Sequence, residues 1–415
     1  MRKFSIALGT AVLIVPAIAR ADDVKFKPII DARLRYETVE QNGPAPVTSD
    51  REANGVTVRL RAGSELTLGH FSVLGEAEGT LAINSDYNAF PFAITSSQRR
   101  TQYPVIADPE NIDLNRLQIQ YQSKAVTATL GRQRINIDDQ RFVGSVGWRQ
   151  NEQTFDAARI EAKLGPVALD GAYAISQRTI FGIDADARQA LGGDFIFLGA
   201  VVQPSKVLTV KSFAYILDYD ENFAFGSSSQ TYGGRLTARV PITKAVKWTF
   251  VSSYARQSDY GQNPRQYSTN YVLLENVLDF KQFKLTTGYE LLGSDSGANT
   301  AFQTPAATLH KFNGWADIFL NTPATGIQDY YAGIGYTLPA VGKAGPLVAS
   351  FVFHRFDSDR NSIHYGNEYD AQISLKLNKH LTALIKYADY QRTGISSFAS
   401  DVSTRKFWAQ VDFIF

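Results

Sequence analysis

The feature that most constrains the fold of this chain is an alternation of apolar and polar residues that recurs along almost its whole length. The last ten residues show it most clearly. One face of this segment carries Phe407, Ala409, Val411, Phe413 and Phe415, and the other carries Lys406, Gln410 and Asp412. Because successive side chains of a strand point to opposite faces of a sheet, the segment is predicted to be a β-strand with one apolar face and one polar face.

The same alternation predicts about eighteen strands. The first three cover residues 30–37, 56–68 and 71–83. The others cover residues 111–122, 124–133, 155–164, 167–177, 193–203, 207–219, 231–240, 246–256, 267–279, 282–292, 328–338, 347–357, 366–377, 381–391 and 405–415. Most of these segments are longer than the roughly five or six residues that are usual for strands of soluble proteins.

The connections between the predicted strands are alternately short and long. Short connections lie at residues 69–70, 165–166, 204–206 and 378–380, and long ones at 84–110, 134–154 and 293–327. In lipid, every backbone polar group has to pair within the protein, and strands achieve this only in a closed sheet. The sequence therefore predicts an all-β fold, a transmembrane antiparallel up-and-down β-barrel of about eighteen strands. We expect it in the outer membrane of a Gram-negative bacterium, with short periplasmic turns and long extracellular loops.

A soluble β-sandwich, propeller or β-helix is the alternative, because strands of soluble sheets also alternate. Aromatic residues near the predicted strand ends favour the barrel, since membrane barrels carry aromatic girdles at both interfaces. We expect this role for Phe71, Tyr121, Tyr219, Tyr271, Phe280, Tyr336 and Tyr390. The terminal Phe415 agrees with a closing barrel strand, and we expect the barrel-assembly machinery to recognise it.

The N-terminal segment is typical of a secretory signal peptide. Arg2 and Lys3 precede an apolar run over residues 4–15, and Ala19 and Ala21 form a small-x-small cleavage pattern. An anchor helix is the alternative, but the run is too short to span a bilayer without tilting or thinning it. We expect residues 1–21 to be the signal peptide and residues 22–415 to form the barrel. No other segment has 18 consecutive apolar residues, so no transmembrane helix is predicted.

The composition excludes several classes of function. The chain contains no cysteine, which excludes disulfide scaffolds, thiol catalysis and cysteine-ligated metal sites. Without residues 1–21 it has 39 basic and 40 acidic residues, so no basic excess indicates nucleic-acid binding. No nucleophile elbow, phosphate loop or metal-binding helix motif is present. A hydrolase that uses a serine with His354 or His364 is the remaining enzyme hypothesis. We expect a protein that is not an enzyme and needs no cofactor or metal.

Two segments resemble stretches of the bacterial alginate export family of outer-membrane porins. They are residues 131–160, GRQRINIDDQRFVGSVGWRQNEQTFDAARI, and residues 307–330, ATLHKFNGWADIFLNTPATGIQDY. The layout of the remaining chain is similar to that family as well. The resemblance implies an eighteen-stranded barrel whose lumen has a strongly basic constriction for anionic sugar polymers. The residues of that constriction do not align one by one onto this chain, so the solute stays open.

Eight arginines alternate with apolar neighbours in the predicted strands. They are Arg33, Arg35, Arg59, Arg61, Arg116, Arg159, Arg235 and Arg239. An arginine facing lipid at mid-depth would cost about 2–4 kcal/mol, so we expect these side chains to line the pore. Rows of arginine select anions, and guanidinium groups form bidentate pairs with carboxylates.

Acidic residues share the polar faces of other strands. They are Glu76, Glu78, Asp170, Glu290, Glu368 and Asp370. We expect them to line the pore opposite the arginines, which would create a transverse field. The alternative is that the arginines and carboxylates pair with each other and only brace the barrel wall.

The long connection after residue 133 is the candidate constriction loop. It carries Arg134, Asp138, Asp139 and Arg141, and we expect ion pairs between its arginines and aspartates to stabilise it. The alternative is a folded surface loop. Asp138 and Asp139 also suggest a site for a hard cation, but too few further carboxylates accompany them to support one.

Together these patterns predict an outer-membrane porin that passes anionic saccharides or small organic anions passively through an arginine-lined lumen. A general diffusion porin and a channel for an apolar compound are the alternatives. The expected partners are outer-membrane lipid, lipopolysaccharide and the anionic solute, and no nucleic acid.

Overall fold

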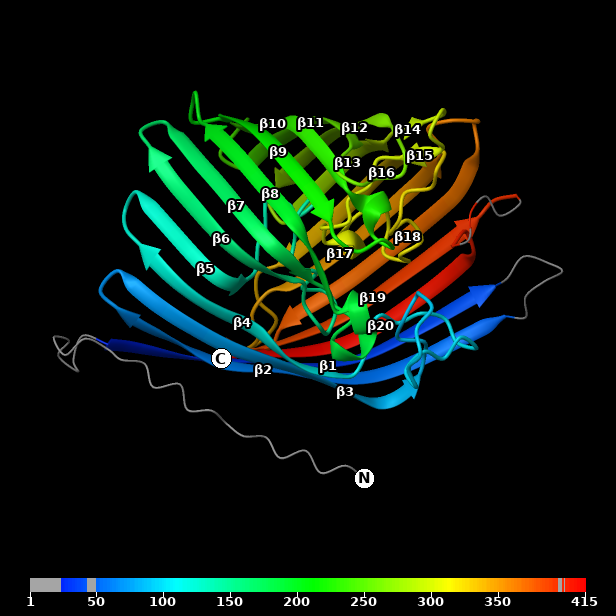
Figure 1. Cartoon of the computed structure of the whole chain (residues 1–415), viewed down its shortest axis with the longest axis horizontal. Coiled ribbons are helices and arrows are strands. Elements are labelled where there is room, and N and C mark those ends of the chain that lie inside the picture. The colour runs from blue at the N-terminus through cyan, green and yellow to red at the C-terminus, as the bar shows by residue number, and fades with distance from the viewer. Residues whose placement is uncertain (1–23, 43–49, 395–397, 399) are drawn as a thin grey trace.

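The computed structural model describes residues 24–42, 50–394, 398 and 400–415. This part of the chain forms a closed antiparallel barrel of eighteen strands (Figure 1). The predicted fold class is therefore confirmed, whereas the predicted signal peptide lies outside the described residues. No helix among the described residues is long and apolar enough to cross a membrane.

The barrel strands follow one another around the wall in chain order. In the first half they are β1 (Val24–Asn42), β2 (Arg51–Leu68), β3 (Phe71–Asp86), β4 (Asn111–Gln122), β5 (Val126–Gln133), β6 (Thr154–Leu164), β7 (Val167–Arg178), β8 (Ala190–Val202) and β9 (Leu208–Tyr219). In the second half they are β10 (Ser229–Pro241), β11 (Val246–Asp259), β12 (Ser268–Phe280), β13 (Phe283–Leu292), β16 (Ile327–Leu338), β17 (Leu347–Asp357), β18 (His364–Lys376), β19 (Leu381–Arg392) and β20 (Ser403–Ile414).

The long connections contain the remaining short elements. These are a two-stranded sheet of β14 (Ser294–Asp295) and β15 (Thr300–Ala301), and the 3-10 helices η2 (Ile183–Arg188), η3 (Phe225–Ser227) and η4 (Leu309–Lys311). The short connections are tight turns at the opposite end of the strands. Gly69 and Gly165 adopt φ values of 58° and 61° there, a region that favours glycine.

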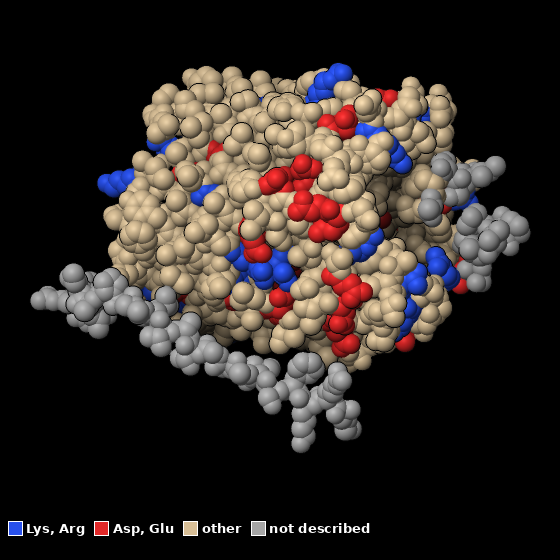
Figure 2. Space-filling model, in the orientation of Figure 1, with Lys and Arg blue, Asp and Glu red and all other residues tan. Residues whose placement is uncertain are grey.

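The barrel closes because β1 pairs with β2 on one side and with β20 on the other. Arg33 of β1 lies opposite Arg59 of β2 and Asp412 of β20. The predicted alternation holds along these strands. Leu34 is 48% exposed on the outer wall, whereas its neighbour Arg35 is fully buried inside. Apolar side chains thus cover the outside, and Figure 2 shows large uncharged areas on the wall in this view.

Four of the seven aromatic residues predicted for the girdles are exposed on the outer wall, namely Phe71, Tyr121, Phe280 and Tyr336. The prediction is wrong for Tyr219, Tyr271 and Tyr390, which are buried inside the barrel. These three lie on the inner faces of their strands, where they pack against loops that fold into the lumen.

Candidate functional site

Two long loops fold into the barrel and meet there. The β5–β6 loop comprises residues 134–153, and the β13–β16 loop comprises residues 293–326. Gly144 N donates to Ala306 O at 2.9 Å, and Thr308 N donates to Gln140 O at 3.0 Å. The side-chain amide of Gln153 also donates to Ala306 O at 2.8 Å. We call the two joined loops the loop plug, because they occupy the lumen as one hydrogen-bonded unit.

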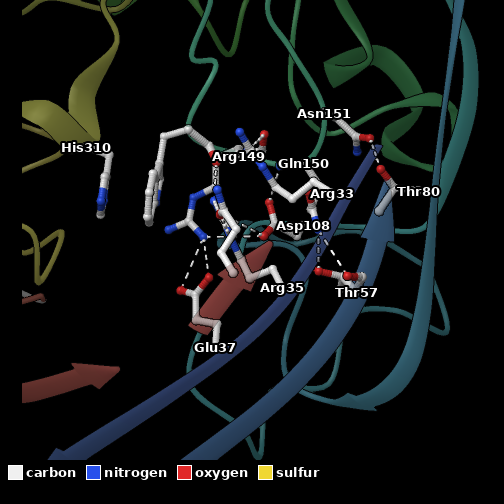
Figure 3. A network of polar contacts seen from close by, with 12 residues as sticks. Arg33, Arg35, Glu37, Thr57, Thr80, Asp108, Arg149, Gln150, Asn151 and His310 are labelled. Atoms are coloured by element: carbon white, nitrogen blue, oxygen red, sulfur yellow. Dashed lines mark hydrogen bonds and ion pairs between the residues drawn. The ribbon is translucent and has the colours of Figure 1, made fainter. Parts of the chain in front are cut away.

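Guanidinium groups of β1 hold the plug against the wall. Arg35 Nη2 donates to Trp148 O at 2.6 Å, and Arg33 Nη1 donates to the same oxygen at 2.8 Å. The Arg35 guanidinium also lies over the Trp148 ring, 4.2 Å from its centroid. Figure 3 shows Arg33 and Arg35 reaching toward this loop. Both side chains point inward, and Arg35 is fully buried where it contacts the loop.

Arg149 reaches back from the plug to the wall, as Figure 3 shows. Its Nη1 lies 3.1 Å from Glu37 Oε2, and its Nη2 lies 2.8 Å from Asp317 Oδ2 in the other loop. Asp108 lies 3.7 Å from Arg149 and also accepts a hydrogen bond from Gln150 N at 2.9 Å. Burial opposes the charge of Arg149, but the carboxylates of Glu37, Asp108 and Asp317 outweigh it and raise its pKa. One buried cation thus links β1 and both loops.

Arg59 and Arg61 of β2 also lie beneath the plug, and neither is more than 3% exposed. Arg61 forms ion pairs with Glu78 of β3 and with Glu152 of the plug, the latter at 2.6 Å. Arg59 pairs with Asp31 of β1. Among the described residues, Arg59 Nε and Nη1 have no hydrogen-bond partner. The predicted basic ladder of β1 and β2 therefore seats the loop, and Arg59 keeps two buried donors free.

The side chains of Arg116 and Arg134 are partly exposed while their partner carboxylates are buried. Arg116 pairs with Glu76 at 2.7 Å, and Arg134 lies 3.4 Å from the same carboxylate and also pairs with Glu152. The side chains of Arg116 and Arg134 are 15% and 28% exposed, against 1% for Glu76 and 4% for Glu152. This part of the interior presents positive charge to solvent.

The aspartates of the β5–β6 loop pair with the opposite wall. Asp138 accepts from Lys211 of β9 at 2.7 Å, and Asp139 accepts from Arg235 of β10 at 2.8 Å. The predicted ion pairs between the arginines and aspartates of this loop are wrong, because strand residues supply the partners instead. In these two pairs the carboxylates are more exposed than the cations, the reverse of the arrangement at Arg116.

Arg141 anchors the β5–β6 loop to β13. Its Nε donates to Glu290 Oε1 at 2.8 Å, and its Nη2 donates to Asn313 Oδ1 at 2.9 Å. Burial opposes the charge of Arg141, but Glu290 and Tyr271 outweigh it and raise its pKa. Glu290 is only 4% exposed, so it is buried in this contact with Arg141.

Glu368 and Asp370 of β18 are fully buried under the β13–β16 loop. Ala316 N donates to Glu368 Oε1 at 2.7 Å, and Trp315 N donates to Asp370 Oδ2 at 3.2 Å. Gly314 adopts φ +83°, and a Cβ there would lie 2.3 Å from Glu368 Oε2. The carboxylates thus bind the backbone of the loop, and only glycine fits beside them.

The other predicted pore residues lie away from the plug contacts on β1 and β2. Arg159 pairs with Asp170 of the neighbouring strand at 2.8 Å, which is a wall-bracing pair. Arg239 lies on the same face of β10 as Arg235 and is exposed near the turn to β11. Among the described residues, no group of three or more His, Asp or Glu side chains is placed to hold a metal ion.

A cluster of tryptophans around Lys386 of β19 was not predicted from the sequence. Lys386 Nζ lies 3.8 Å from the Trp315 ring centroid, 4.2 Å from that of Trp148 and 5.5 Å from that of Trp408. It also lies 2.8 Å from His310 Nε2. Lys386 occupies an inward position of its strand, and this position was the only feature of the sequence that could have indicated the cluster. Its partners come from both loops, so the strand pattern could not show them.

Hydrogen bonding and burial together define the tautomer of His310. The Asp317 carboxylate only accepts, so His310 Nδ1–H donates to it at 2.7 Å, and Nε2 is then the acceptor that faces Lys386 Nζ at 2.8 Å. Burial lowers the pKa of His310 well below its usual range, which agrees with a neutral ring. Burial works against the Asp317 carboxylate, but the hydrogen bond from His310 and the charges of Lys406 and Arg149 hold its pKa well below the usual range. The junction of the two loops therefore has a neutral histidine between Lys386 and an anion.

Comparison with known structures gives the same fold at low sequence identity. Pseudomonas aeruginosa OpdK with vanillate is 13% identical, with a TM-score of 0.67 over 95% of this chain and 99% of that chain. Pseudomonas aeruginosa OpdQ is 14% identical, with a TM-score of 0.63 over 94% and 98%. Acinetobacter baumannii OccAB2 is 13% identical, with a TM-score of 0.66 over 95% and 98%. No curated protein sequence matches the chain.

These neighbours share the barrel fold of this chain, and one of them, OpdK, is an outer membrane protein. The fold together with the family match to residues 30–274 places this protein in the outer membrane of a Gram-negative bacterium. At this identity the neighbours establish the fold and carry no residue-level information about the lumen. The family is established by the sequence itself. Residues 30–274, more than half of the chain, match the alginate export family, and the protein therefore belongs to that family.

Proposed function

We propose that this channel passes anionic saccharides or small organic anions passively, and that the partly exposed arginines of its interior attract them. The observation that carries the proposal is the arrangement of Arg116 and Arg134. Their side chains are partly exposed, at 15% and 28%, while Glu76 and Glu152 are buried. A passing anion therefore meets the positive end of each pair first. Guanidinium is also suited to bidentate binding of carboxylates.

Two further observations support an anionic solute. Within the part of the chain that the structure describes, two nitrogen atoms of Arg59 have no partner beneath the plug, so Arg59 can bind an anion if the loop moves. Vanillate, which is present in the OpdK structure, is a small carboxylate, and that barrel has the same fold. The family match adds uronate polymers to the candidate solutes.

Ion selectivity in planar bilayers tests this function. A double variant, Arg116→Gln and Arg134→Gln, should lower the anion-to-cation permeability ratio, measured as the reversal potential in a salt gradient. Arg355→Gln is the matched control, because Arg355 pairs with Asp357 and its side chain is 55% exposed. An unchanged ratio in the double variant would reject these arginines as the source of selectivity.

The C-terminal residue has a proposed partner of its own. Phe415 N donates to Ile30 O at 2.9 Å, which ties it to β1, while its side chain is 60% exposed and stacks on His380 at 5.5 Å. We propose that this exposed ring is the contact for the barrel-assembly machinery. Lipid and lipopolysaccharide would cover the apolar outer wall around it.

A further inference from the structure

The barrel wall is interrupted beside the outer half of β4. This strand pairs with β3 from residue 111 to residue 121, but its ladder with β5 covers residues 117–122 only. The reason is the β5–β6 loop. β5 ends at Gln133, where the chain turns into the lumen, and β6 begins at Thr154 in register with β7 and the end of β5. Residues 111–116 thus form an edge without a neighbouring strand on that side, within the described part of the chain.

Side chains replace the missing ladder at this edge. Leu114 N donates to Asp113 Oδ1 at 2.7 Å, and Leu114 O accepts from Arg132 Nη1 at 3.0 Å. Arg178 at the end of β7 reaches across the interruption and pairs with Asp113. Ile183 N donates to Asn111 Oδ1 at 3.1 Å. Two guanidinium groups therefore close a wall that backbone hydrogen bonds close elsewhere.

A small polar cavity lies at this interruption. Its volume is about 10 Å³, which is about the space that one water molecule needs. Glu78, Asn151 and Glu152 line it from the lumen side, and Leu114, Asn115 and Arg178 line it from the wall. Leu114 is 41% exposed on the outer surface. The cavity therefore lies between residues of the plug and Leu114, which is exposed on the outer wall.

The surroundings of the cavity differ from the rest of the outer wall. Figure 2 shows acidic and basic side chains together on the wall, over the region between β4 and β7 in Figure 1. Apolar residues lie directly beside them, since Ile112 and Leu117 are 71% and 52% exposed. Above the cavity, the β3–β4 and β7–β8 loops pack together, with Phe92 and Phe181 rings 4.8 Å apart. The interruption thus lies next to two packed loops. It has polar residues inside and apolar residues on its outer side.

We propose that this interruption is a lateral gate, through which an amphiphile in the outer leaflet reaches the lumen. Its polar head would lie among Asn111, Asp113 and Asn115, and its apolar tail would lie along Ile112 and Leu117. Arg132 and Arg178 hold the gate closed. Unpaired backbone is costly in hydrocarbon, so a broken ladder persists in a membrane wall only where polar groups or water satisfy it. Opening the gate needs no strand separation, because only side-chain contacts have to break.

Cysteine labelling from the lipid phase tests the gate, and the natural absence of cysteine makes single sites unambiguous. The reagent is a phosphatidylethanolamine with a maleimide on its headgroup, mixed into vesicles that contain the folded barrel. Asn115→Cys is the test site. Ile112→Cys is the positive control on the outer surface. Asp170→Cys is the negative control, because it lies inside a part of the wall whose ladder is continuous.

Labelling of Asn115→Cys but not of Asp170→Cys would support the gate. Replacing both Arg132 and Arg178 by alanine should raise the labelling rate of Asn115→Cys by roughly tenfold. Each substitution removes a charge-assisted hydrogen bond that keeps the gate closed, so the gate should open more often. Arg159→Ala should leave the rate unchanged, because its pair has a similar exposure but lies in intact ladder. Folding of each variant is verified by its electrophoretic mobility without heating.

Two results would overturn the proposal. One is labelling of Asn115→Cys no faster than of Asp170→Cys, even without the two arginines. The other is rapid labelling that the two arginines do not change, because they would then not hold the gate. Asn151→Cys is the second test site if Asn115→Cys does not fold, since it lines the same cavity from the loop. Neither result depends on the ion selectivity of the lumen.

Discussion

The two sides of the barrel hold the same infolded loop by different means. On the β1–β3 side, the β5–β6 loop is bound by buried charges, with Arg149 shared between Glu37 and the second loop. On the β9–β12 side, Phe142 of the same loop packs against Phe213 at 5.3 Å and Tyr271 at 5.1 Å, and this packing lies beside the ion pairs of Asp138, Asp139 and Arg141. We call the contacts on the first side the polar seat, and the ring contacts of Phe142 on the second side the aromatic seat.

The difference between the seats lies in how each responds to the loss of one partner. Apolar packing loses free energy in proportion to the area that is exposed, and neighbouring side chains can fill part of the gap. A buried ion pair that loses one partner leaves a charge without compensation. The polar seat therefore restricts the loop to one position. The aromatic seat stabilises the loop in that position, but the loss of one of its contacts costs less free energy.

The largest effect is expected from Arg149→Met. This change leaves Glu37, Asp108 and Asp317 buried without their shared cation, and we expect it to destabilise the seated loop by about 3–5 kcal/mol. The displaced loop should appear as a larger single-channel conductance. Arg355→Met is the control, because its exposed pair with Asp357 should not affect conductance. Wild-type conductance in Arg149→Met would show that the polar seat does not position the loop.

A smaller effect is expected from Phe142→Ala on the opposite side. The change removes ring contacts with Phe213, Tyr215, Tyr271 and Phe302, and we expect a loss of about 1.5–3 kcal/mol. The loop should stay seated for most of the time. The channel should therefore have the conductance of the parent protein for most of a recording, interrupted by brief openings of larger conductance. An effect larger than that of Arg149→Met would reverse the proposed ranking of the two seats.

The smallest effect is expected from pH, acting through His310. Its pKa in the seated loop lies well below the usual 6.5, so the neutral ring stabilises the seated state fully above about pH 6.5. This stability is lost as pH falls below that value, because the released histidine takes up a proton that the seated one cannot accommodate. A proton on Nε2 would face the Lys386 ammonium, with Arg149 nearby and only Asp317 to compensate.

Single-channel recordings between pH 7.5 and 5.5 measure this effect, as a rising frequency of openings on acidification. His310→Gln is the control variant, because a side-chain amide keeps an acceptor for Lys386 and does not titrate over this range. If the His310→Gln variant responds to pH in the same way as the parent, another group is responsible.

The barrel could be predicted from the sequence because alternation is a local property of each strand. In β20, for example, Phe407, Ala409, Val411 and Phe413 lie on the outer face, and Lys406 and Gln410 are buried inside, as expected. The long connections also marked the two loops that enter the lumen. Both inferences need only the order of residues along one segment.

The partners of the inward side chains could not be predicted in this way. Glu290 pairs with Arg141, which lies far away in the chain, and this pairing depends on how the loop crosses the lumen. Tyr271 was assigned to the girdle because its position near a strand end fits both environments. It lies inside because Phe142 and Phe302 provide an aromatic surface there. Side chains that contact an infolded loop can be placed only when the path of that loop is known.

The cluster around Lys386 has an optical consequence. Three of the four tryptophans of the chain, Trp148, Trp315 and Trp408, lie within 6 Å of one ammonium group at the junction of the loops. The fourth, Trp248, lies on β11 and hydrogen-bonds to Asn276 of the neighbouring strand. Most of the tryptophans of this membrane protein therefore lie at the junction of the two loops. The wavelength and intensity of their fluorescence should change when the loops move, without any added dye.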